Sequence, residues 1–268
     1  GLAASSRQAG PREPIRAVKL LRVQAHAAHA SRSFAAEVRA QTEARLGFRV
    51  PGKLLQRPAQ LGQAVTAGQL LAQLDAQDYA LGAQAAQAQV QAAQTQRDLA
   101  QADWQRFSAL QAQGFISPVE LDRRRAQLEA AQAQLQQAKA QATVQGNQNH
   151  YTQLRSDAAG VVTGVHAEPG QVVAAGAPVL TVALDGPRDA VFAVPEGFQA
   201  QLTVGQTVQV QPWGDGAPLA GQVREVAASA DPVTRTFLVK VALPPAAGGQ
   251  ALALGSTEQV VVPGGTSM

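Results

Sequence analysis

A glycine-containing pattern occurs twice in this chain, and this repeat constrains the fold more than any other feature. The offset between the copies is a constant 108 residues, with Gly52, Gly62 and Gly68 in the first copy and Gly160, Gly170 and Gly176 in the second. Apolar positions match at the same offset, namely Val65 with Val173, Leu71 with Val179, and Leu74 with Val182. Two related structural units are therefore expected.

Each copy has the pattern of short strands separated by turns. We expect the six glycines at turns, because glycine reaches positive φ without a Cβ clash. Neither copy has enough strands to bury its apolar face alone. Residues 46–75 and 154–183 are therefore predicted to pack face to face as one small sandwich with a shared core.

Residues 76–153 separate the two copies and must begin and end at the same place. An antiparallel helical hairpin meets this requirement. The segment from Asp75 to Gln113 is interrupted only by Gly82, and a return helix is predicted from Pro118 to about Gly146. Alanine and glutamine, rather than large apolar residues, dominate this segment.

The two predicted helices carry small and apolar residues at alternating steps of three and four, which is the spacing of a coiled coil. In the return helix these positions are Leu121, Arg124, Leu128, Ala131, Leu135, Ala138 and Ala142. In the first helix they are Leu81, Ala85, Ala88, Ala92, Thr95, Leu99 and Ala102. We expect these two sets to meet in the seam of the hairpin.

The turn between the helices is marked by ordinary capping signals. Gly114 follows the first helix, a common C-terminal position. Ser117, Pro118 and Glu120 fit the N-cap, first and third positions of the return helix. The predicted hairpin tip spans about Arg106 to Asp122. Alanine- and glutamine-rich helices gain little from their own surface, so we expect other copies or a partner to cover the outer face, the alternative being a solvated arm.

The remaining segments flank the repeat and have β character. Residues 31–45 and 184–254 are predicted to form a further β domain. Residues 17–30 and 255–268 are predicted to form a partial β region, and residues 1–16 a flexible leader. The predicted fold class is thus mainly β, elongated and multi-domain, with a long antiparallel α-helical hairpin inserted into a split sandwich.

Composition argues against several classes of function. Cysteine is absent, which excludes disulfides and thiolate chemistry. The 22 basic and 19 acidic residues are mostly scattered, so nucleic-acid binding is not expected. The four histidines are dispersed (His26, His29, His150 and His166) and methionine occurs once, so no metal site is predicted. No nucleophile and base are suitably paired, and neither an enzyme nor a cofactor is expected.

Four segments of the chain carry a family resemblance. They are Leu46 to Lys53, Val65 to Asp75, Ala159 to Val162 and Glu168 to Gly176. In this order around a helical hairpin, they resemble the membrane fusion proteins, the periplasmic adaptor subunits of tripartite efflux pumps. The resemblance implies a lipoyl-like domain for the split sandwich and a six-stranded β-barrel for 31–45 with 184–254.

The resemblance also implies roles and partners. The family's tip pattern is matched by Arg106, Leu110, Ser117 and Asp122, which are expected to dock on a TolC-type outer-membrane channel. The inner-membrane partner is expected to be an RND or ABC transporter, and the adaptor to assemble with itself as a hexamer or trimer of dimers. A periplasmic location is implied, with anchoring through a lipidated or signal-derived N-terminus outside this chain.

The chain departs from the family pattern in one respect, and two alternative functions remain open from the sequence. The family usually continues with a membrane-proximal β domain, for which only Ala17 to Gln24 and about Thr257 to Pro263 remain here. An adaptor of an ABC exporter or type I secretion system is one alternative function. A lipoyl or biotinyl carrier is another, although Lys53 and Lys139 are not placed at the hairpin turn that carriers modify.

Overall fold

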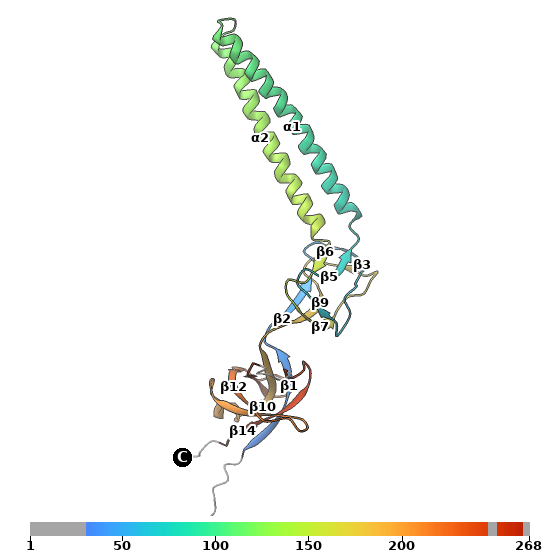
Figure 1. Ribbon diagram of the computed structural model, residues 1–268, viewed down its shortest axis with the longest axis vertical. Coiled ribbons are helices and arrows are strands. Elements are labelled where there is room, and N and C mark those ends of the chain that lie inside the picture. Colours follow the sequence, from blue (N-terminus) through green and yellow to red (C-terminus); the bar gives the residue numbers. More distant parts are fainter. Residues whose placement is uncertain (1–30, 246–250, 265–268) are drawn as a thin grey trace, which may run out of the picture.

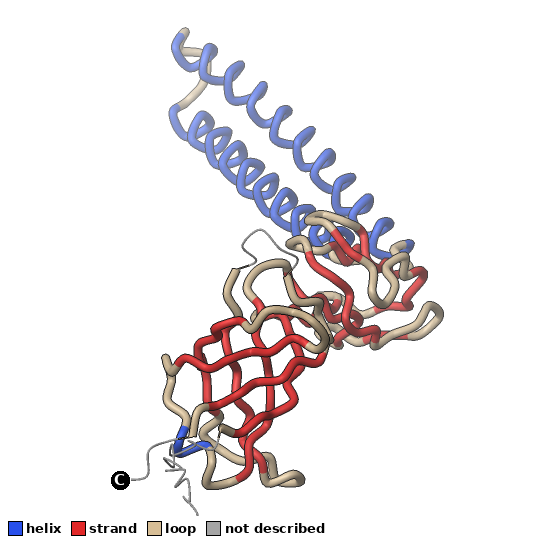
Figure 2. Tube along the Cα trace, turned by 60° about the horizontal axis from the view of Figure 1, so that its bottom comes forward, coloured by secondary structure: helices blue, strands red, loops and turns tan. Residues whose placement is uncertain are grey.

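The computed structural model describes residues 31–245 and 251–264. Three bodies follow one another along the long axis of the molecule: a β-barrel, a β-sandwich and a helical hairpin (Figure 1). The hairpin extends from the end of the sandwich that faces away from the barrel (Figure 1, Figure 2).

The sandwich is built from two four-stranded sheets, ordered β2-β9-β7-β4 and β6-β5-β3-β8. Its strands are β2 (Glu43–Gly47), β3 (Gly52–Gln56), β4 (Ala64–Val65), β5 (Leu70–Leu74), β6 (Gln153–Arg155), β7 (Gly160–Val165), β8 (Val172–Val173) and β9 (Pro178–Leu184). The offset of 108 residues relates the strands in pairs: β2 to β6, β3 to β7, β4 to β8 and β5 to β9. The strand order of one sheet thus becomes the strand order of the other. The sequence repeat is therefore a structural pseudo-symmetry.

The two copies interleave rather than forming one sheet each, which corrects the face-to-face prediction. The inner strands of each sheet come from one copy, and an edge strand comes from the other copy. In one sheet β4 pairs with β7, and in the other β8 pairs with β3. Equivalent backbone bonds join the copies: Gly62 N donates to Val162 O at 2.8 Å, and Gly170 N to Leu54 O at 2.7 Å. Neither copy can fold into its native form without the other.

The matched apolar residues of the repeat form the centre of the sandwich core. Leu71, Leu74, Val179 and Val182 are fully buried, and Val65 and Val173 nearly so. Leu54 and Phe48 pack in the same cluster. Burial of these side chains supplies the stabilisation that the short strands cannot provide themselves.

The barrel closes in the order β1-β10-β13-β12-β11-β14. Its strands are β1 (Arg32–Ala40), β10 (Arg188–Pro195), β11 (Thr207–Pro212), β12 (Leu219–Val226), β13 (Thr236–Ala242) and β14 (Thr257–Val262), with a 3-10 turn η1 at Gln199–Gln201. Valines and Phe192 fill the interior, and Phe34 stacks on Phe192 with ring centroids 5.4 Å apart.

Two predicted boundaries in this region are wrong. Residues 255–268 were expected outside the barrel, but β14 pairs with β1 and β11 and closes it, because β1 and β11 would otherwise be exposed edges. Residues 43–45 were expected in the barrel, but they pair with β9 in the sandwich. The predicted leader 1–16 and the predicted region 17–30 lie outside the described residues.

The hairpin consists of α1 (Gln77–Ala112) and α2 (Pro118–His150), which run antiparallel (Figure 1). Helix α2 continues four residues beyond the predicted end at Gly146, since glycine is tolerated in a long helix at a modest cost. All seven seam positions predicted for α2 are partly or fully buried, with Leu135 only 6% exposed. The α2 seam prediction is confirmed.

The seam predicted for α1 is wrong. All seven predicted positions are exposed, with Leu81 at 56% and Leu99 at 57%. The face turned inward is another one: Ala86 and Ala93 are buried on it, and the following residues are half-buried: Tyr79, Gly82, Val90, Arg97, Ala100, Trp104 and Phe107. In an alanine- and glutamine-rich helix several faces have similar hydrophobicity, and the close approach of α2 favours the face with Gly82, Ala86 and Ala93.

Candidate docking tip of the helical hairpin

The tip is a tight turn whose free backbone groups are satisfied locally. Gly114 adopts φ of 78°, and its N–H donates to Gln111 O at 2.9 Å. The Phe115 N–H donates to Leu110 O at 3.0 Å. Ser117 is the N-cap of α2, where its Oγ accepts from the Glu120 N–H at 3.3 Å, with Pro118 at the first helical position. The capping prediction is confirmed, and the turn has one defined path.

The four predicted docking residues all lie around this turn. Arg106 is on α1 with its side chain 65% exposed, and its guanidinium lies 3.4 Å from Asp103. Leu110 is half-buried in the last turns of α1, and Asp122 is exposed on α2. Ser117 is occupied as a cap. Arg106 and Asp122 are therefore available to a partner, while Leu110 and Ser117 shape the tip.

Cation–π and ionic contacts brace the helices below the turn. The Arg124 guanidinium lies 4.1 Å from the Phe107 ring centroid, and Arg125 lies 5.2 Å from that of Trp104. The Glu120 carboxylate forms an ion pair with Arg124, with 3.2 Å between Glu120 Oε1 and Arg124 Nη2. The two cation–π contacts join α2 to α1, and the Glu120–Arg124 ion pair lies within α2, so the helices are braced below the tip.

Two apolar side chains at the tip were missed from the sequence. Phe115 is 71% exposed and Val119 is 69% exposed, on either side of Ser117. Large apolar residues exposed at one turn favour protein contact. The sequence signal was present, because an aromatic residue following the Gly114 turn has no seam position to fill.

The repeat glycines serve two structural purposes. Gly62, Gly68, Gly170 and Gly176 are at turns with φ between 79° and 93°. Gly52 and Gly160 begin strands β3 and β7, so the prediction that these two glycines lie at turns is wrong. A Cβ on Gly160 would lie 2.3 Å from Ala183 O, and a Cβ on Gly52 would lie 3.2 Å from Leu74 Cδ1. Close packing between strands requires glycine at Gly160.

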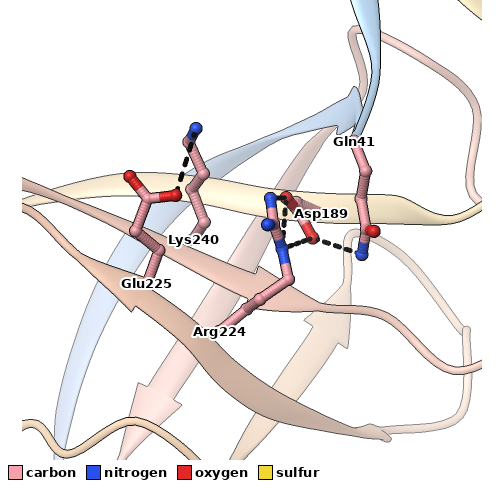
Figure 3. Close-up of polar contacts among 5 residues, drawn as sticks. All are labelled: Gln41, Asp189, Arg224, Glu225 and Lys240. Atoms are coloured by element: carbon pink, nitrogen blue, oxygen red, sulfur yellow. Dashed lines mark hydrogen bonds and ion pairs between the residues drawn. The ribbon is translucent and has the colours of Figure 1, made fainter.

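A buried acidic group lies where the barrel meets the sandwich (Figure 3). Asp189, 1% exposed, follows the connector between β9 and β10, and it accepts from Gln41 Nε2 at 2.9 Å and from Arg224 Nε at 3.2 Å. The hydrogen bond from Arg224 to Asp189 raises the pKa of the Arg224 guanidinium. Burial opposes this effect, and the negative charge of Asp189 adds to it. Gln41 lies on the other connector, so Asp189 ties both crossings of the chain together.

Other candidate chemistry is sparse in the described part. Between residues 31 and 264, outside the undescribed 246–250, no three His, Asp or Glu side chains gather as a metal-ligating group. His26 and His29 lie outside the described residues. Neither described helix combines the length and the hydropathy of a membrane span.

Relatives in sequence cover most of the described chain. The nickel-cobalt-cadmium resistance protein NccB of Alcaligenes xylosoxydans is 31% identical over 221 residues, covering 82% of this chain and 54% of that protein. The multidrug resistance protein MdtA of Yersinia pestis is 30% identical over 182 residues, covering 62% of this chain and 39% of that protein. The chain thus spans about half or less of the length of these relatives.

Solved structures share the fold at low sequence identity. A MacA-MexA chimera carrying the Pseudomonas aeruginosa MexA α-hairpin has a TM-score of 0.66 at 21% identity, covering 88% of this chain and 79% of that one. ZneB from Cupriavidus metallidurans has a TM-score of 0.57 at 22% identity, covering 86% and 97%. Residues 42–184, the sandwich with its inserted hairpin, match the model of the RND MFP barrel-sandwich hybrid domain. The chain belongs to the RND-type membrane fusion protein family.

Proposed function

We propose that this chain is the bridging part of a non-catalytic periplasmic adaptor in an RND efflux pump. In this proposal the hairpin, acting as a two-stranded coiled-coil arm, reaches a TolC-type outer-membrane channel, and the β domains contact the inner-membrane transporter. The full-length protein is held in the periplasm by an anchored N-terminus, and several copies act together in the pump.

The observation that carries the proposal is the hairpin tip. A long, largely polar arm ends in a braced turn with exposed Phe115 and Val119, next to the exposed charges of Arg106 and Asp122. An apolar centre with charged groups beside it is typical of a protein-docking surface. The Arg106 guanidinium can donate several hydrogen bonds to carbonyl groups of a partner's helical end.

The decisive variant is Arg106→Asp, tested by complementation of a strain that lacks the adaptor gene. The substitution reverses the charge of an exposed side chain and leaves the seam intact. We expect drug or metal resistance to fall to the level of the deletion strain while the protein accumulates normally. Lys139→Asp, an equal charge change at an exposed position on the shaft, is the matched control and should retain resistance. Full resistance with Arg106→Asp would refute the docking role.

A further inference from the structure

A cavity of about 270 Å³ opens on the side of the sandwich where both sheets end. Strand β2 is an edge strand of one sheet, and β6 is an edge strand of the other. The cavity lies between the end of β2 with the following Arg49, and β6 with the following Asp157. His150 and Tyr151, at the foot of α2, line it as well (Figure 1). The cavity therefore adjoins both copies of the repeat and the base of the hairpin.

Part of the cavity wall is apolar and continuous with the core of the sandwich. Phe48 and Leu154 line the cavity and also belong to the core cluster, where they are 2% and 8% exposed. Leu46, on the opposite strand, is the repeat equivalent of Leu154 and packs against the same cluster. A wall that excludes water strengthens the attraction between a ligand and the charges beside it.

Two arginines line the cavity without an acidic partner. Most arginines in the described ranges form an ion pair with a carboxylate, but Arg49 and Arg155 form none with any described residue. Asp157 is the single acidic side chain among the described residues that line the cavity. The two guanidinium groups therefore outweigh the carboxylate, and the cavity favours an anion over a cation.

Both guanidinium groups are held in place by uncharged partners. The Arg49 guanidinium carbon lies 4.8 Å from the centroid of the Tyr151 ring, and Tyr151 packs against the sandwich core. Arg155 donates from Nη1 to Gly68 O and from Nη2 to Gln153 Oε1, each at 2.9 Å, and from Nε to Gln153 Oε1 at 3.3 Å. These bonds use three of its five N–H groups. Positioned guanidinium groups with free donors are well suited to carboxylate and phosphate groups.

We propose that this cavity binds a small oxyanion, the phosphate or carboxylate group of a compact molecule, through Arg49 and Arg155. The ring of His150 can donate a further hydrogen bond. The cavity volume is below the roughly 300–1,000 Å³ of sites for drug-sized molecules, which favours a compact ligand. The bound anion joins the segment after β2, strand β6 and the foot of α2, and so stiffens the base of the hairpin. The site is separate from the bridging function and does not depend on it.

Isothermal titration calorimetry of the whole chain with inorganic phosphate and, separately, with citrate tests the site at constant ionic strength. We expect saturable binding to one site for at least one of these anions, and the anion that binds identifies the preferred oxyanion. Arg49→Gln should weaken this binding by about tenfold or more, because a charge-assisted hydrogen bond is lost. Asp157→Asn should strengthen it, because this change removes a carboxylate that repels the anion.

The matched control is Arg45→Gln, which removes the same charge from an exposed position on β2 that does not line the cavity. This variant should bind the anion as the unsubstituted chain does. Hydrogen exchange gives a second readout, since the anion should slow exchange in residues 147–155 of the unsubstituted chain but not of Arg49→Gln. The site is overturned if neither anion binds, or if Arg45→Gln weakens binding as much as Arg49→Gln, which would indicate attraction to the general positive charge. Binding without slowed exchange would overturn the stiffening of the hairpin base.

Discussion

The sandwich and the hairpin are parts of one matched domain, yet they are held together in different ways. The sandwich cluster contains fifteen buried side chains, from Phe48 to Val182. The two helices, 36 and 33 residues long, contain only Ala86, Ala93 and Leu135 as buried residues. Burial of apolar area therefore stabilises the sandwich, whereas the hairpin depends more on helix propensity and on contacts at the seam and the tip. A region with so small a core is suited to be completed by partners.

The largest expected effect compares one buried leucine from each region. Leu54→Ala in the sandwich should cost about 3–5 kcal/mol, because the side chain is fully buried and the interleaved sheets cannot collapse around the cavity. Leu135→Ala in the hairpin should cost about 2 kcal/mol, because two helices flanked by water can close partly over the gap. Hydrogen exchange read by mass spectrometry gives the opening free energy of each region. Equal losses would contradict the comparison.

A middle effect separates the two copies of the repeat inside the sandwich. Gly160→Ala should destabilise the protein by about 3 kcal/mol, since its Cβ would overlap the Ala183 carbonyl oxygen at 2.3 Å. Gly52→Ala should cost about 1 kcal/mol or less, because its nearest neighbour, Leu74 Cδ1 at 3.2 Å, is a side-chain end that can move. Urea unfolding of the two variants measures the difference. Equal losses of stability in the two variants would contradict the prediction, because they would show that the two glycines are equally crowded.

The smallest effect compares two capped turns, one in the barrel and one at the hairpin tip. Asp231 accepts from the Thr234 and Val233 N–H groups, and these bonds lower the pKa of its carboxyl group below the ordinary 3.8. Its stabilising contribution is complete above pH 3.8 and is lost as pH falls through the lowered pKa. Ser117 caps α2 with a hydroxyl, which does not titrate.

Amide chemical shifts of Val233 and Thr234, followed by NMR down to about pH 2, test this difference. We expect a transition with a midpoint below 3.8, and its disappearance in Asp231→Asn. A midpoint at or above 3.8 would show that the carboxylate does not hold the turn.

The sequence predicted the sandwich because the repeat offset is independent of local propensity. Leu121, Leu128 and Leu135 also marked the α2 seam, since they stand out from an alanine and glutamine background. In α1 the same reasoning failed, because alanines recur at heptad spacing on several faces of this helix and the two leucines that stand out, Leu81 and Leu99, lie on an exposed face. The true seam depends on which face fits α2, and that information lies in the partner helix.

The errors at the domain boundaries have a similar origin. Residues 43–45 and 257–262 have ordinary strand patterns, and only their pairing with β9, or with β1 and β11, assigns them to a domain. At the tip, capping chemistry placed Ser117 and Gly114 correctly because caps act over a few residues. Phe115 had a local signal too, because it follows the Gly114 turn and has no seam position to fill, whereas Val119 lies within the first turn of α2 and had none.

The nesting of the three bodies has a consequence for the order in which the chain folds. The hairpin lies inside the sandwich sequence, and the sandwich lies inside the barrel sequence, since β1 and β10 flank them both. Closing the sandwich over a disordered insert would carry the entropy cost of a long loop, and a formed hairpin removes most of that cost. The same holds for the barrel once the sandwich has formed. Folding should therefore proceed from the tip toward the barrel, so that damage to the hairpin delays every later step.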